Sequence, residues 1–289
     1  MDRFCFFKGI CSEFAGLSSS ENGKGKCLQG RVRVSYGFSL VKGKANHPME
    51  DYHVAKFVEV KGHKLGLFAI FDGHLGDKVP LYLQKHLFNN ILKEDEFWIH
   101  PDKAITKAYE KTDKAILSHS PELGKGGSTA VTAILIDGRK LWIANVGDSR
   151  GILVTSSGGR GRIFGAHTVD HEPDAERDNI ETKGGFVSSM PGDVPRVNGQ
   201  LAVSRAFGDK SLKSHLSSDP DIHPVDITSD TELLILASDG IWKVIDNQAA
   251  VDIARKFKDP HVAAKHLTIE AVERDSKDDI SCIVVRFNA

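Results

Sequence analysis

Apolar and polar residues follow two different periods along the chain. Segments 32–41 and 52–60 alternate in part between the two kinds and contain many β-branched and aromatic residues, which indicates strands. The polar stretch 61–64 contains a glycine and leads into the apolar block 65–71, so we expect a turn between two paired strands. That block stops abruptly at Asp72.

The helical period appears next. In segments 76–92 and 102–118, apolar side chains recur at about every fourth position, as they do on one face of a helix. Pro101 suits the first turn of the second helix. The same patterns predict further strands at 128–137, 140–148, 150–156, 232–240 and 280–287, and helices within 171–185, 247–257 and 261–274.

The order of these elements predicts the fold class. Strands that arrive as hairpins form antiparallel sheets, and helix pairs grouped apart from the strands cover packed sheets from outside. We therefore expect an α+β fold of four layers, α-β-β-α, with a central antiparallel β-sandwich. Residues 18–30 are polar and glycine-rich, which predicts a disordered tail over 1–30 and a single folded domain over 31–289.

Composition excludes several classes of protein. The 289 residues carry a net charge of −1, without the basic balance of a nucleic-acid-binding protein. No apolar run reaches the roughly 18 residues of a membrane span. The four cysteines form no CxxC pair, which argues against a disulfide framework or a zinc ribbon and favours a reducing cytoplasmic or nuclear compartment. A monomer is expected, and the phenylalanines and cysteines of residues 4–14 belong either to a mobile tail or to an anchor.

Acidic residues stand at five strand termini, three of them beside glycine. They are Glu50 with Asp51, Asp72, Asp148, Asp239 and Asp278. Each one alone is compatible with an ordinary turn. The strands before Asp72 and Asp239 are apolar up to the carboxylate, however, and several carboxylates at one end of a sheet would repel each other unless divalent cations were present. Oxygen ligands select Mg²⁺ or Mn²⁺, and the histidines show no zinc-ligand spacing.

Eight short motifs in a fixed order identify the family that the chain resembles. They are MEDYH (49–53), FDGHLG (71–76), GGSTA (126–130), NVGDSR (145–150), HEP (171–173), GQLAVSRAFGD (199–209), ASDGIW (237–242) and KDDIS (277–281). This series resembles the metal-dependent serine/threonine protein phosphatases of type 2C. The segment GKANHPMEDYHVAKF is most similar to the sequences of a plant subgroup. The resemblance implies a β-sandwich flanked by helix pairs, with phosphoproteins as substrates.

The resemblance also implies a centre with two Mg²⁺ or Mn²⁺ ions. In this resemblance Asp72 bridges both ions, and Gly73 binds one of them through its carbonyl oxygen. Asp239 and Asp278 bind one ion through their carboxylates. Glu50 and Asp51 hold metal-bound water. A hydroxide between the two ions would attack phosphorus in line.

His74 matches the general acid that would protonate the leaving alkoxide. It is alternatively a solvated loop histidine. A haloacid-dehalogenase-type phosphatase is disfavoured, because that chemistry needs an aspartate at the place of His74.

The sequence departs from the family pattern in three places. Many members carry an arginine that grips phosphate where this chain has Asn46, and Lys44 is one of the nearest cations. Lys243 stands where members often have an aspartate that helps Asp148 to hold a third metal, so a third site is doubtful. Asp148 is alternatively a structural residue bonded to its neighbours in sequence. The segment 188–200 lacks the tryptophan of the abscisic-acid co-receptors. The missing tryptophan disfavours a co-receptor role. The departures at Asn46 and Lys243 leave open a weakly active pseudophosphatase or docking protein.

Overall fold

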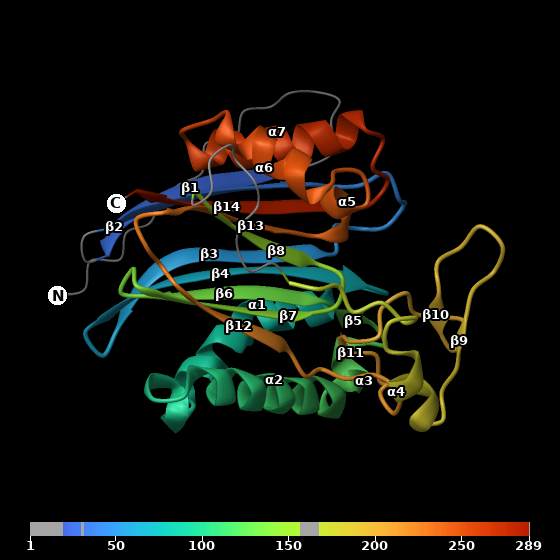
Figure 1. Cartoon of the computed structure of the whole chain (residues 1–289). Helices are drawn as coiled ribbons and strands as arrows, with labels where there is room; N and C mark the ends of the chain where they lie inside the picture. Colours follow the sequence, from blue (N-terminus) through green and yellow to red (C-terminus); the bar gives the residue numbers. More distant parts are fainter. Residues whose placement is uncertain (1–19, 30–31, 157–167, 289) are drawn as a thin grey trace.

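Two antiparallel sheets pack face to face at the centre of the molecule (Figure 1). The computed structural model describes residues 20–29, 32–156 and 168–288. The first sheet has the strand order β1-β2-β14-β13-β8. Its strands are β1 (Ser20–Gln29), β2 (Val32–Val41), β8 (Arg150–Thr155), β13 (Thr231–Ala237) and β14 (Ile280–Asn288).

The second sheet has the order β11-β5-β4-β6-β7-β12, and β3 pairs with β4. Its strands are β3 (Asp51–Val60), β4 (His63–His74), β5 (Gly127–Ser128), β6 (Ala130–Ile136), β7 (Lys140–Val146), β11 (Phe207–Gly208) and β12 (Asp221–Asp226). A separate small hairpin-like pair consists of β9 (Val187–Ser188) and β10 (Arg196–Val197).

Helices cover both outer faces of the sandwich (Figure 1). On the second sheet lie α1 (Lys78–Lys93) and α2 (Pro101–Ser118), joined by η1 (Asp95–Trp98) and followed by α3 (Ser120–Leu123). On the first sheet lie α5 (Asp239–Trp242), α6 (Asn247–Arg255) and α7 (Pro260–Glu273). The short α4 (Arg177–Thr182) stands beside β9 and β10. The predicted four-layer α+β fold is therefore confirmed.

The surroundings of strand β4 explain why residues 65–71 form a continuous apolar block. Successive side chains of a strand point to opposite faces. Phe68 and Ile70 belong to the core between the two sheets, whereas Leu67, Ala69 and Phe71 belong to the core under α1 and α2. All five are buried because both faces of β4 are covered. Asp72 is thereby held at the end of a rigid central strand.

The prediction of disorder was wrong for residues 20–29, which form β1. Their glycines fit aromatic side chains of β2, since a Cβ at Gly23 would lie 2.7 Å from the ring of Phe38. Lys24 also forms an ion pair with Asp259 at 2.7 Å. The polar composition of this segment did not indicate a strand, although backbone pairing with β2 holds it at the edge of the sheet. The predicted tail over residues 1–19, with its phenylalanines and cysteines, lies outside the described residues.

Strand β12 was not predicted either. It contains Pro224 and pairs with β7 at the edge of the second sheet, where a missing backbone donor is tolerated. Among the described residues, no helix has the length and apolar character needed to cross a membrane.

Candidate metal centre

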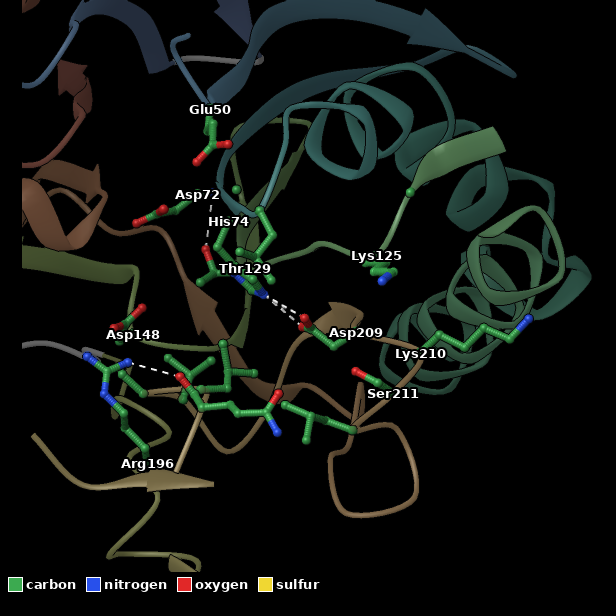
Figure 2. Close-up of a pocket in the computed structure, with 18 of the residues that line it drawn as sticks. Glu50, Asp72, His74, Lys125, Thr129, Asp148, Arg196, Asp209, Lys210 and Ser211 are labelled. Atoms are coloured by element: carbon green, nitrogen blue, oxygen red, sulfur yellow. Dashed lines mark hydrogen bonds and ion pairs between the residues drawn. The ribbon is translucent and has the colours of Figure 1, made fainter. Parts of the chain in front are cut away.

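Strand ends from both sheets bring the predicted acidic residues to one end of the sandwich. Asp51 opens β3 and pairs in register with Asp72 of β4. Asp148 lies shortly after β7, Asp239 opens α5 two residues after the end of β13, and Asp278 lies just before β14. A cavity of about 950 Å³ opens at this end. Its lining includes Gly73, Asp239 and Asp278. It also includes Glu50, Asp72, His74 and Asp148, which are labelled in Figure 2.

Three of the carboxylates form a tight cluster. Asp72, Asp148 and Asp239 each place a carboxylate oxygen within 4.8 Å of the others. Burial, and then the negative charge of neighbouring aspartates, raises the pKa of Asp72 well above its usual range, and burial does the same to the pKa of Asp148. The cluster is therefore unfavourable when all its members are ionised, and divalent cations would relieve the repulsion.

Two buried carboxylate oxygen atoms at the centre lack a hydrogen-bond partner among the described residues and are suited to bind a cation. Oδ2 of Asp51 accepts a hydrogen bond of 2.6 Å from Ser281. Oδ1 of Asp51 and Oδ1 of Asp239 are buried and have no hydrogen-bond partner among the described residues. Unpaired buried carboxylate oxygens are costly. The clustered carboxylates supply only oxygen ligands, which suit Mg²⁺ or Mn²⁺.

Gly73 is required by close backbone packing. Its N–H donates to the carbonyl oxygen of Glu50 at 3.2 Å. A Cβ on Gly73 would lie 2.7 Å from that oxygen and 2.6 Å from Pro80, so a side chain would separate β4 from the chain before β3. Oε1 of Glu50 accepts a hydrogen bond of 2.7 Å from the N–H of Gly76, which fixes the carboxylate at the cavity.

His74 is paired with a carboxylate that sequence reasoning missed. Its Nε2 donates to both oxygens of Asp209, at 2.9 and 2.8 Å (Figure 2). Asp209 is buried, and a Cβ on Gly127 would lie 2.0 Å from its Oδ2. Asp209 closes the AFGD motif, but its partner is 135 positions away, so only the fold shows the pair.

The two residues that follow Asp148 in sequence, which could have been its hydrogen-bond partners, bond to other residues. Ser149 bonds to Thr129 at 2.7 Å, and Arg150 binds Asp170 through two hydrogen bonds of 2.9 and 2.6 Å. The turn before Asp148 is instead fixed by His171, whose Nδ1 accepts a hydrogen bond of 3.0 Å from the N–H of Gly147. Asp148 therefore points into the cluster.

Lys44, one of the cations nearest to Asn46 in sequence, lies outside the cavity lining. Its Nζ lies 2.6 Å from Asp275. Asn46 is exposed and does not line the cavity either. The cationic side chains that do line it include Lys125, Arg196 and Lys210 (Figure 2). Arg196 forms an ion pair with Asp193 at 2.7 Å, which offsets part of its positive charge.

The buried carboxylates lead to a pH-dependent stability. Burial, with a further contribution from neighbouring aspartates, raises the pKa of Asp51 to about 7. Between the unfolded pKa of about 4 and this value, the folded protein binds more protons, so its stability falls as pH rises. In EDTA, Asp51→Asn should raise Tm by at least about 5 °C more at pH 8 than at pH 5, where the wild-type carboxyl is already protonated. An equal effect at both pH values would contradict this prediction.

Comparison with known proteins agrees with the fold and the acidic site. The sequence model described as protein phosphatase 2C matches residues 37–280. Probable protein phosphatase 2C 41 of Oryza sativa subsp. japonica is 67% identical over 99% of both chains, and probable protein phosphatase 2C 9 of Arabidopsis thaliana is 65% identical over 99% of this chain and 100% of the relative.

Solved structures share the architecture. The crystal structure of a serine-threonine phosphatase 2C from Toxoplasma gondii has a TM-score of 0.75, with 24% identity over 94% of this chain and 100% of that chain. The structure of a C. elegans sex-determining protein has a TM-score of 0.74, with 26% identity over 96% of this chain and 66% of that chain. The family match covers most of the chain, and the plant relatives align from end to end. The chain therefore belongs to the protein phosphatase 2C family, in its plant-like subgroup.

Proposed function

We propose that this chain hydrolyses phosphoserine and phosphothreonine in proteins, with two divalent cations in the acidic centre and His74 as the general acid. The observation that carries the proposal is the convergence of Asp72, Asp239 and Asp278 on the cavity that His74 lines. Asp72 and Asp239 reach the same point from different sheets, and Oδ1 of Asp239 is buried without a partner among the described residues.

Each residue has a distinct task in this proposal. Asp72 would bridge both cations, Gly73 would offer its carbonyl to one, and Asp239 with Asp278 would hold the other. Glu50 and Asp51 would act through water. Bound divalent cations would lower the pKa of a water molecule, so that hydroxide is available near neutral pH, and would offset the charge of the phosphate.

Asp209 supports His74 in its role. Because Asp209 occupies Nε2 through two contacts, it fixes the plane of the ring, and Nδ1 remains as the atom that can donate a proton to the leaving serine or threonine oxygen. No hydrogen bond joins Nδ1 to any part of the chain that the structure describes. A carboxylate that orients an imidazole in this way is common in acid–base catalysis.

A metal-dependence assay tests the proposal. The purified chain should release phosphate from a phosphothreonine peptide with Mg²⁺ or Mn²⁺, and EDTA should abolish the release. Activity that persists in EDTA would overturn the metal-based mechanism. No activity with any metal would favour a docking protein of the same fold. This second candidate is supported by Asn46 and by the ion pairs that Lys243 forms with Asp239 and Asp278.

Replacing Asn46 tests how the phosphate is held. An arginine there could bind phosphate with two parallel hydrogen bonds, which lysine cannot do. Asn46→Arg should lower KM for a phosphopeptide by about threefold to tenfold with little change in kcat, because the contact would stabilise substrate and transition state alike. Lys44→Ala should leave KM unchanged, since Lys44 pairs with Asp275. An unchanged KM in Asn46→Arg would mean that another cation grips the phosphate.

A further inference from the structure

Lys243 brings a positive charge directly into the acidic centre. Its Nζ forms ion pairs with Oδ2 of Asp239 and, at 3.1 Å, with Oδ2 of Asp278. Both partners are proposed metal ligands. Asp239 also belongs to the cluster in which Asp72, Asp148 and Asp239 lie within 4.8 Å of one another. One ammonium group therefore touches the carboxylates at which a cation would bind.

The local backbone places Lys243 there. Lys243 directly follows α5, one helical turn after Asp239, and its N–H donates to the carbonyl oxygen of Asp239 at 2.9 Å. The preceding Trp242 anchors this turn, because its Nε1 donates to the carbonyl oxygen of Ala237 at 2.8 Å. Side chains four positions apart on a helix face each other. The ion pair with Asp239 is thus built into the turn, and the long side chain adds the second contact across to Asp278.

The charge of Lys243 opposes an additional cation beside Asp148. A third ion held by Asp148 and Asp239 would share Asp239 with the ammonium of Lys243. Like charges a few ångströms apart repel strongly at a partly buried site. Oδ1 of Asp239 stays buried and unpaired among the described residues, while Oδ2 is occupied by Lys243. Asp239 therefore has one oxygen for a metal ion and one for the lysine.

We propose that Lys243 is a built-in counter-ion that limits the acidic centre to two divalent cations and holds its carboxylates together when no metal is bound. This inference rests on the proposed function, because it assumes that Asp239 and Asp278 are metal ligands. Lysine acts as a single point charge and cannot neutralise the whole cluster. In this proposal the acidic centre still binds two divalent cations, but the position beside Asp148 does not bind a third.

Counting bound Mn²⁺ tests the first part. Equilibrium dialysis at increasing Mn²⁺ should give two ions for the wild type and three for Lys243→Asp. Lys243→Gln should bind the ion at Asp239 and Asp278 about tenfold more tightly, because a repelling charge has been removed. Three ions on the wild type, or no gain in Lys243→Asp, would overturn the proposal. A wild type that binds no Mn²⁺ at all would instead overturn the proposed function.

Thermal unfolding tests the second part without any activity measurement. In EDTA, Lys243→Gln should lower Tm by about 2–4 °C, and saturating Mn²⁺ should remove most of that difference. Lys140→Gln is the matched control, because Lys140 forms a surface ion pair of 2.7 Å with Asp226 far from the cavity lining. The control should change Tm equally with and without metal. If Lys243→Gln behaves like the control, Lys243 is an ordinary surface lysine and the proposal fails.

Discussion

Asp72→Asn is expected to abolish Mn²⁺-dependent hydrolysis of a phosphothreonine peptide, with a loss in kcat on the order of a thousandfold or more. Asparagine keeps the size of the side chain but removes the negative charge that would bridge both cations. The metal-free protein should remain folded. Burial and neighbouring aspartates raise the pKa of Asp72 well above its usual range, so its ionised form destabilises the fold near neutral pH.

Stability in EDTA separates catalysis from folding in this experiment. Because Asp72→Asn removes one of several mutually repelling carboxylates, its Tm in EDTA should equal or exceed that of the wild type. Addition of Mn²⁺ should raise the wild-type Tm and should raise the variant Tm much less. Retained activity would show that Asp72 is not essential for metal-dependent hydrolysis. A collapse of Tm in EDTA would show that its role is structural.

His74→Ala should reduce kcat on a phosphothreonine peptide by about 10²–10⁴-fold, the range typical of a missing general acid. On p-nitrophenyl phosphate the loss should be much smaller, because that leaving group departs without a proton. Asp209→Ala should show the same difference between substrates to a smaller degree, since it would only release the ring of His74.

The comparison between substrates makes the His74 prediction decisive. Equal losses on both substrates would assign His74 to binding or folding. His86→Ala is a suitable control, because His86 is an exposed residue of α1 that contacts Tyr82. This variant should leave kcat on both substrates unchanged. Mn²⁺ binding should survive in His74→Ala, which distinguishes it from Asp72→Asn.

The sequence predicted the elements whose residues alternate clearly or form long apolar blocks. β4 was found because it is buried on both faces and stops at Asp72. The helices α1 and α2 were found because each has one apolar face. β1 was missed because its stability comes from backbone pairing with β2, which its composition does not reveal.

The candidate site was predicted where a residue's own neighbours in sequence carry the signal. Asp239 follows an apolar strand, and that pattern is local. The pair of His74 with Asp209 joins distant segments, and so does the contact of Lys243 with Asp278. Such contacts depend on the path of the chain in three dimensions. The ion pair of Lys44 with Asp275, outside the cavity lining, also depends on the fold.

The order of strands in the first sheet has a consequence for a shortened form of this protein. β1 shields one edge of the first sheet by pairing along the whole of β2. The family match begins at residue 37, in the middle of β2, and ends at residue 280, where β14 begins. A protein trimmed to those limits would leave β13 with an unpaired backbone edge in an apolar sheet. Such edges pair with other molecules, so the trimmed protein should self-associate while the full chain does not expose that edge.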